Sequence, residues 1–214
     1  MSFFIPAGRS RYPVASHMPA GSRYRYAKRR YRILFRLLDA LCGPAFQLVR
    51  GMNARRPATD PRSILIVQLD HIGDAVLSMP MLRALREGFP KASIDVLASQ
   101  SNREIFETCP HVRRVHVSHD NWLSREPHTR VYIGEALRLT RSIRPFRYDV
   151  GIDARGDFLV ALVLWLAGIP TRVGFAAGGS QVFLTESLRW SGREGRRHKR
   201  DLYLELLTWL SGRA

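Results

Sequence analysis

The segment from Ile64 to Leu85, ILIVQLDHIGDAVLSMPMLRAL, places the strongest constraint on how this 214-residue chain can fold. It begins with a nearly continuous apolar run, which is typical of a strand that is buried on both faces. Helical spacing follows through Val76, Leu77 and Leu82. Strands buried on both faces occur in parallel sheets covered by helices, so the segment predicts the first strand, turn and helix of an α/β domain.

The same alternation of strand and helix continues to the end of the chain. Further strands are predicted at residues 92–99, 112–118, 148–154 and 171–176, and residues 178–190 are interpreted as irregular. Helices are predicted at residues 74–90, 102–110, 130–144, 157–168 and 198–212. The third strand alternates and should lie near an edge, whereas helix 157–168 is apolar all round and should be buried. The pattern predicts a parallel sheet with helices on both faces.

The basic residues are concentrated in the first 60 positions. The formal net charge is +16, and residues 1–60 hold 12 of the 34 Lys and Arg residues but 2 of the 18 acidic ones. Residues 1–22 are interpreted as a disordered basic tail, residues 23–62 as a basic amphipathic helix and linker, and residues 63–214 as the folded domain.

The basic amphipathic segment has three possible roles. A basic stripe beside an apolar face suits a helix that lies on an anionic membrane surface. The second alternative is a helix that packs on its own domain with solvated arginines. A nucleic-acid-binding arm is disfavoured, because the apolar face would then have no role.

Several classes of protein are excluded by motifs that the sequence lacks. Neither G-x-G-x-x-G nor a P-loop G-K-[ST] is present, so no dinucleotide or P-loop site is predicted. Cys42 and Cys109 lack metal-binding spacing and fit a reducing compartment. No signal peptide is recognised, and the longest apolar run, residues 158–170, is too short to span a membrane.

The turn Asp70–Asp74 holds two carboxylates, a histidine and a glycine at the end of the first strand. Ligands bind at this edge of open parallel sheets. Gly73 is expected to allow a tight turn and close approach of the backbone to a ligand. Asp74 lies at the start of the helix, where the helix dipole favours a carboxylate, and it is a plausible general base for a hydroxyl. The alternative is that Asp74 or Asp70 merely caps the helix.

Two later strands end in comparable turns. The fourth strand is followed by Arg155, Gly156 and Asp157, and the fifth by the glycine-rich stretch 174–179. The carboxyl ends of parallel strands meet at one edge of a sheet, so the three turns predict a composite site. Arginine and backbone amides in such a site would suit phosphate or polyol ligands.

Four stretches together resemble a known family: residues 64–99, 109–117, 148–175 and 183–188. In order and spacing they closely resemble glycosyltransferase family 9, the lipopolysaccharide heptosyltransferases, which carry heptose from ADP-heptose to the lipid A–Kdo inner core. The likeness covers roughly residues 62–213. The x-x-G-D turn that ends at Asp74 is among its most specific marks.

The resemblance implies a GT-B fold, in which two Rossmann-like domains face each other and no metal is required. The N-terminal domain would bind the acceptor, with Asp74 as the catalytic base. His71, Gly73 and the turn Arg155, Gly156 and Asp157 would shape the acceptor site. The alternative for His71 is a hydrogen bond to the local backbone without a ligand. For Asp70, the favoured interpretation from the residues remains a structural cap. In such an enzyme, the basic residues of the stretch 113–130 would meet phosphates or carboxylates of the acceptor, and the alternative is that they form a solvated face; they are Arg113, Arg114, Arg125 and Arg130.

This chain departs from the family pattern because no second domain follows the helix at residues 198–212. No resident cofactor is expected, and the domain that would hold the ADP-heptose donor is absent. The expected function is lipopolysaccharide heptosyl transfer by a chain truncated to its acceptor domain, acting at the cytoplasmic face of the inner membrane. The alternatives are an inactive acceptor- or membrane-binding module and a half-enzyme that needs a separate donor domain.

Overall fold

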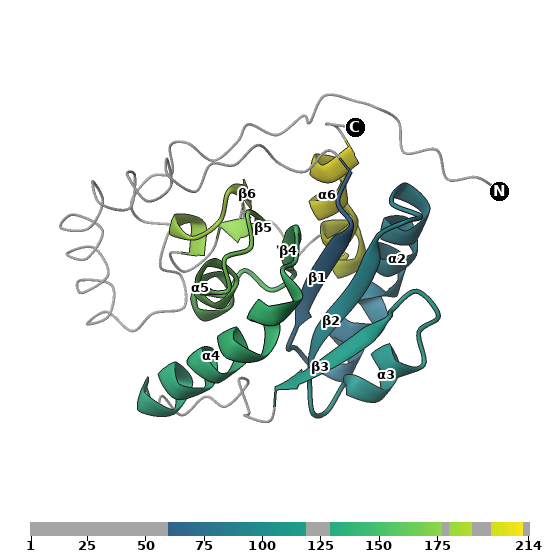
Figure 1. The fold of residues 1–214 in the computed structure, drawn as a ribbon. Coiled ribbons are helices and arrows are strands. Elements are labelled where there is room, and N and C mark those ends of the chain that lie inside the picture. Colours follow the sequence, from purple (N-terminus) through teal and green to yellow (C-terminus); the bar gives the residue numbers. More distant parts are fainter. Residues whose placement is uncertain (1–59, 119–128, 177–179, 190–197, 212–214) are drawn as a thin grey trace.

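The computed structural model describes residues 60–118, 129–176, 180–189 and 198–211 (Figure 1). Its sheet contains β1 (Ser63–Gln68), β2 (Ser93–Ser99), β3 (Arg114–Ser118), β4 (Val150–Asp153), β5 (Thr171–Ala176) and β6 (Glu186–Arg189). The strand order is β3-β2-β1-β4-β5-β6, and all neighbouring strands are parallel. The predicted parallel α/β fold is therefore confirmed, and β3 lies at an edge as expected.

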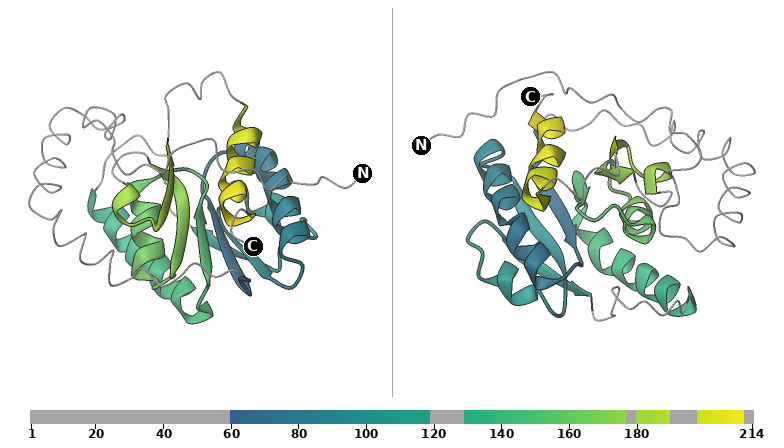
Figure 2. Two further views of the ribbon diagram at one scale, coloured as in Figure 1. Left: turned by 90° about the horizontal axis from the view of Figure 1, so that it is seen from above. Right: turned by 180° about the vertical axis from the view of Figure 1, so that it is seen from behind.

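Helices cover both faces of the sheet, as the two views of Figure 2 show. The helices are α2 (Ile72–Gly88), α3 (Arg103–Glu107), α4 (Thr129–Ile143), α5 (Phe158–Leu166) and α6 (Lys199–Ser211), with short 3-10 turns η1 (Arg144–Phe146) and η2 (Ser180–Val182). One face is covered by α2, α3 and α6, and the other by α4 and α5 (Figures 1 and 2).

The apolar run of β1 follows from this layering. Ile64 and Ile66 belong to the core cluster under α2 and α6, whereas Leu65 and Val67 belong to the cluster under α4 and α5. All four side chains are at most 1% exposed. A strand that contributes to two cores cannot alternate polar and apolar residues.

Two details differ from the sequence-based expectation. The stretch interpreted as irregular contains the short edge strand β6. Helix α5 is not buried all round, because Phe158, Leu162 and Trp165 are partly exposed beside Phe183. The rings of Phe158 and Trp165 lie 5.2 and 5.5 Å from the ring of Phe183, in a small cluster at one end of the sheet.

The predicted tail at residues 1–22 and nearly all of the basic segment at residues 23–62 lie outside the described residues. Among the helices that the structure does describe, none has the length and apolar character needed to cross a membrane.

Candidate functional site

The candidate site lies where the turns after β1 and β4 meet. These strands are neighbours, and the chain leaves β1 toward β2 and β3 before it returns to β4 on the other side. The order of strands reverses at this point, and such a switch point is the usual place for a ligand in an open parallel sheet. Two of the three predicted turns are therefore brought together. In the third turn, β5 ends at Ala176, and residues 177–179 lie outside the described chain.

In the turn after β1, neither acidic residue caps the helix. The N-cap of α2 is His71, which has an extended backbone and makes no capping hydrogen bond through its side chain. The expectation that Asp70 is a cap is therefore wrong. Asp74 lies in the first turn of α2, where its N–H donates to the carbonyl oxygen of His71 at 3.0 Å.

Gly73 also differs from the prediction, because no tight turn requires it. It lies inside α2, and among the glycines described only Gly156 and Gly168 have a positive φ. A Cβ built on Gly73 would meet nothing within 4 Å. His71, Ile72 and Gly73 are all exposed, so the start of α2 presents an open surface beside Asp74.

The side chain of Asn102, in the turn after β2, holds the backbone at the end of β1. The fully buried amide of Asn102 donates to the carbonyl oxygens of Gln68 at 3.1 Å and Asp70 at 2.8 Å. Its own carbonyl oxygen accepts the N–H of Ser99 at 2.9 Å. The sequence analysis did not identify Asn102 as a site residue. The one signal for it was its position shortly after the second predicted strand, at the same edge of the sheet.

The turn after β4 is organised by Asp153. Its fully buried carboxylate accepts the N–H groups of Arg155, Gly156 and Asp157 at 2.9 to 3.0 Å. Burial raises the pKa of Asp153 to about 8, with a further contribution from Asp157, while the three N–H donors oppose the shift. Asp157 caps α5, because its Oδ1 accepts the N–H of Leu159 at 2.9 Å.

Arg155 connects the two turns. Its Nε lies 3.5 Å from Asp70 Oδ1 and 3.8 Å from Asp157 Oδ2. Burial raises the pKa of Asp70 above its usual range, Arg155 opposes this shift, and Asp74 adds to it. Asp70 therefore shares one electrostatic environment with residues of both turns.

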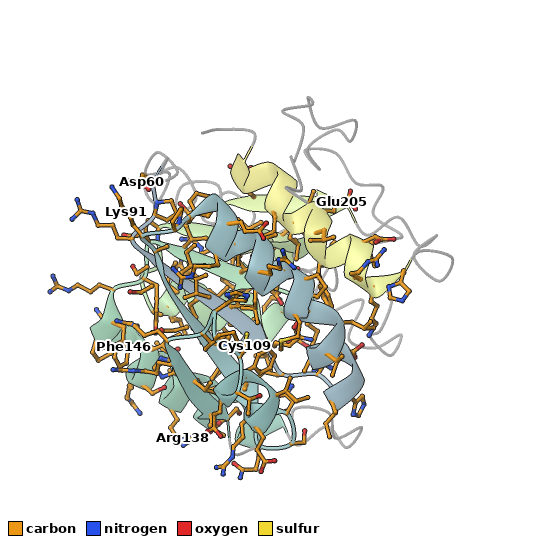
Figure 3. All side chains as sticks on the ribbon, turned by 90° about the vertical axis from the view of Figure 1, so that its right-hand side faces the viewer. Asp60, Lys91, Cys109, Arg138, Phe146 and Glu205 are labelled. Carbon is orange, nitrogen blue, oxygen red and sulfur yellow. The ribbon has the colours of Figure 1, made fainter. Side chains whose placement is uncertain are left out.

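Helix α6 adds two residues that sequence reasoning missed. The Nζ of Lys199 lies 2.6 Å from Asp74 Oδ1. One turn later, the hydroxyl oxygen of Tyr203 accepts a hydrogen bond from Gln68 Nε2 at 3.2 Å. Figure 3 shows α6 and α2 side by side, which is how residues so far apart in sequence reach the same turn.

The balance of charge favours a ligand rich in hydroxyl groups over a phosphate. Three carboxylates (Asp70, Asp74 and Asp157) face two cations, Arg155 and Lys199, and each cation is engaged by a carboxylate. Carboxylates accept hydrogen bonds from hydroxyl groups and repel phosphates. Across the described residues, no group of three or more His, Cys, Asp or Glu side chains is placed to hold a metal ion.

Two arginines expected near acidic groups of a ligand are engaged elsewhere. Arg113 makes two hydrogen bonds with the buried carboxylate of Asp95, at 2.9 and 2.7 Å, and Arg114 lies 4.4 Å above the ring of Phe146. Asp95 also accepts the hydroxyl of Tyr148 at 2.6 Å. Arg113 and Arg114 lie at the start of β3, away from the carboxyl ends of the strands.

Curated relatives match about half of the chain. Lipopolysaccharide heptosyltransferase 2 of Escherichia coli is 33% identical over 114 residues, which is 52% of this chain and 30% of the relative. Lipooligosaccharide heptosyltransferase 2 of Haemophilus ducreyi is 30% identical over 129 residues, which is 59% of this chain and 34% of the relative. The chain thus spans about a third of the length of these relatives. No family model matches the chain.

Solved structures share the fold. A family 9 glycosyltransferase from Veillonella parvula superposes with a TM-score of 0.60 at 22% identity, over 74% of this chain and 43% of that one. An E. coli heptosyltransferase with ADP-2-deoxy-2-fluoro heptose gives 0.55 at 17% identity, over 70% and 48%. With the sequence matches, these findings confirm the resemblance of this chain to the heptosyltransferases of glycosyltransferase family 9.

Proposed function

We propose that this chain is the acceptor-binding domain of a lipopolysaccharide heptosyltransferase and that Asp74 is its catalytic base. The main supporting observation is that Asp74 stands at the switch point of the sheet, beside the open surface at Gly73, and that within the described residues no backbone group bonds to its carboxylate. The E. coli and H. ducreyi relatives supply the type of reaction.

The reaction would proceed in one displacement. Asp74 takes the proton of an acceptor hydroxyl as that oxygen forms a bond to the anomeric carbon of the heptose. The bond between the anomeric carbon and the diphosphate oxygen breaks, and ADP leaves with the electron pair. A second domain would bind the ADP-heptose donor, because the site described here has no free cation for a diphosphate.

The acceptor in this proposal is a Kdo–lipid A type core precursor. Asp70, Asp74 and Asp157 would accept hydrogen bonds from its sugar hydroxyls. His71 and Gly73, which are exposed at the start of α2, and the neighbouring turn Arg155–Asp157 would also contact it. The basic segment at residues 23–62 would hold the chain on the anionic cytoplasmic face of the inner membrane, where such an acceptor is presented.

The experiment measures heptose transfer from ADP-heptose to Kdo₂-lipid A by the full chain, alone and mixed with a donor domain taken from the E. coli relative. Asp74→Asn should lower transfer by about 10²- to 10⁴-fold, the usual contribution of a general base. Glu87→Gln is the matched control. Glu87 lies on the same helix and pairs with Arg83 at 2.8 Å, so the variant loses the same charge outside the site.

Each result separates the alternatives. Transfer only in the mixture, lost in Asp74→Asn and kept in Glu87→Gln, would establish a half-enzyme. Transfer by the chain alone would contradict the need for a separate donor domain. Acceptor binding without transfer in any combination would favour the inactive binding module.

A further inference from the structure

Lys199 occupies an unfavourable place for a cation. It is the first residue of α6, where the helix dipole disfavours positive charge. Its ammonium nevertheless lies 2.6 Å from Asp74 Oδ1, and the two residues are 125 positions apart. The next residue, Arg200, pairs with Asp201 on its own helix. Of these two neighbouring cations, Lys199 is the one that pairs with the turn after β1.

The helix that presents Lys199 is firmly held. Leu202, Leu206 and Leu207 are at most 4% exposed in the core under α2 and α6. Tyr203 is 3% exposed, and its hydroxyl accepts the hydrogen bond from Gln68 at the end of β1. The position of Lys199 is thus set by buried contacts one turn away.

The two partners differ in exposure. The Lys199 side chain is 49% exposed, whereas the Asp74 side chain is 16% exposed. An ion pair this open adds little to the stability of a fold. A purely structural role in joining α2 to α6 is therefore a weak explanation, since buried apolar contacts already join these helices.

We propose that Lys199 is a positioning residue for Asp74: it holds Oδ1 of the carboxylate, so that Oδ2 meets the acceptor hydroxyl. The proposal rests on the proposed function, because it assigns Lys199 a part in the same acceptor site. Lys199 touches neither reacting atom and acts through Asp74. The positive charge of Lys199 also acts on Asp70: burial raises the pKa of Asp70, and Lys199 opposes part of that rise.

The first test needs no acceptor. In ¹⁵N-lysine NMR spectra of the full chain, an ammonium held by a carboxylate exchanges its protons slowly enough to give a signal. The Lys199 ammonium signal should be present in the wild type and in Arg200→Met, and lost in Asp74→Asn. A Lys199 signal that is the same in wild type and Asp74→Asn would overturn the proposal.

The second test is a double-mutant cycle on acceptor affinity, with deacylated Kdo₂-lipid A titrated calorimetrically into the full chain. Lys199→Met should weaken binding by roughly tenfold, and Lys199→Arg by less than about threefold, because arginine can also reach the carboxylate. In the Asp74→Asn background, Lys199→Met should add less than about a twofold change. Arg200→Met removes the same charge from the next position and should bind like wild type.

The outcomes are distinguishable. An equal effect of Lys199→Met in both backgrounds would overturn the proposal, because Lys199 would then act without Asp74. Failure of Lys199→Arg to restore affinity at an unchanged melting temperature would also count against it. If the wild type binds no acceptor, the proposed function fails, and the lysine signal still decides whether Lys199 holds Asp74.

Discussion

The turns after β1 and β4 share one pattern, Asp-x-x-Gly-Asp, and use it differently. The first runs from Asp70 to Asp74 and the second from Asp153 to Asp157. In the second turn the helix begins after the pattern, and both carboxylates bond to backbone N–H groups. In the first turn the helix begins inside the pattern, at Ile72, and the carboxylates face Arg155 and Lys199.

This difference distinguishes a carboxylate that stabilises the fold, Asp153, from one that can contact a ligand, Asp74. Asp153 is fully buried and holds three N–H groups, so it has no capacity to meet a ligand. Asp74 is partly exposed, and its carboxylate pairs with the half-exposed side chain of Lys199. The same five-residue pattern thus stabilises the backbone of the turn after β4, whereas in the turn after β1 it leaves a carboxylate accessible to a ligand.

The largest expected difference between the turns is in stability. Asp153→Ala should lower the free energy of unfolding by about 3 kcal/mol, because it leaves three N–H groups in a buried or half-buried turn without an acceptor. Asp74→Ala should lower it by less than about 1 kcal/mol, since it removes one open ion pair. Urea unfolding of the full chain, followed by circular dichroism, measures both.

Equal losses in the two variants would break the comparison, because Asp74 would then be as structural as Asp153. Glu87→Ala is the control for losing a carboxylate from an exposed ion pair, since Glu87 pairs with Arg83 on the surface of α2. It should behave like Asp74→Ala in stability and unlike it in transfer.

The pH dependence of stability gives a second, smaller contrast. Burial raises the pKa of Asp153 to about 8 in the folded chain, from an ordinary value of 3.8 for an aspartate. Between these values the folded state binds more protons than the unfolded state, so the free energy of unfolding should fall as pH rises. One group contributes at most about 1.4 kcal/mol per pH unit.

Other groups titrate in the same range, so the measurement is the difference between wild type and Asp153→Asn, which cannot ionise at this position. From pH 5 to pH 7 the wild type should lose stability relative to the variant, by roughly 2 to 3 kcal/mol. Parallel curves would mean that the three N–H donors keep Asp153 ionised in the folded chain.

The fold was predictable because its strongest signals are local. The apolar run of β1 and the alternation of strands and helices follow from burial on both faces of a parallel sheet. Strand β6 was not predicted because its four residues, Glu186–Arg189, are mostly polar and pair with a neighbouring strand on one side only. Helix α5 was expected to be fully buried because composition does not show that one of its faces lies at the end of the sheet.

The site was predictable only as far as topology determines it. Asp74 and Arg155 could be placed at one edge because parallel strands align their carboxyl ends. Lys199 and Asn102 could not, because their contacts depend on how α6 and the turn after β2 pack in three dimensions. Nor could the sequence distinguish the two Asp-x-x-Gly-Asp turns, since the residue at which a helix begins is decided by the hydrogen bonds of the whole turn.

The smallest effects are expected from the two glycines of the pattern. Gly156 has a φ of 77°, which costs a residue with a side chain about 1–2 kcal/mol, so Gly156→Ala should destabilise the chain by that amount. Gly73 is helical with open space around it, and alanine favours a helix, so Gly73→Ala should leave stability unchanged or raise it by up to about 1 kcal/mol. Thermal unfolding of both variants measures the two changes in stability, which should be a loss for Gly156→Ala and no loss for Gly73→Ala.

The Gly73→Ala variant also tests which side of Asp74 an acceptor approaches. If the acceptor comes over the exposed start of α2, the added methyl group lies in its path, and affinity for deacylated Kdo₂-lipid A should fall although the protein is as stable as before. Full affinity in Gly73→Ala would place the acceptor elsewhere around Asp74. A loss of stability equal to that of Gly156→Ala would instead show that both glycines serve the backbone, and the contrast between the two turns would then rest on their carboxylates alone.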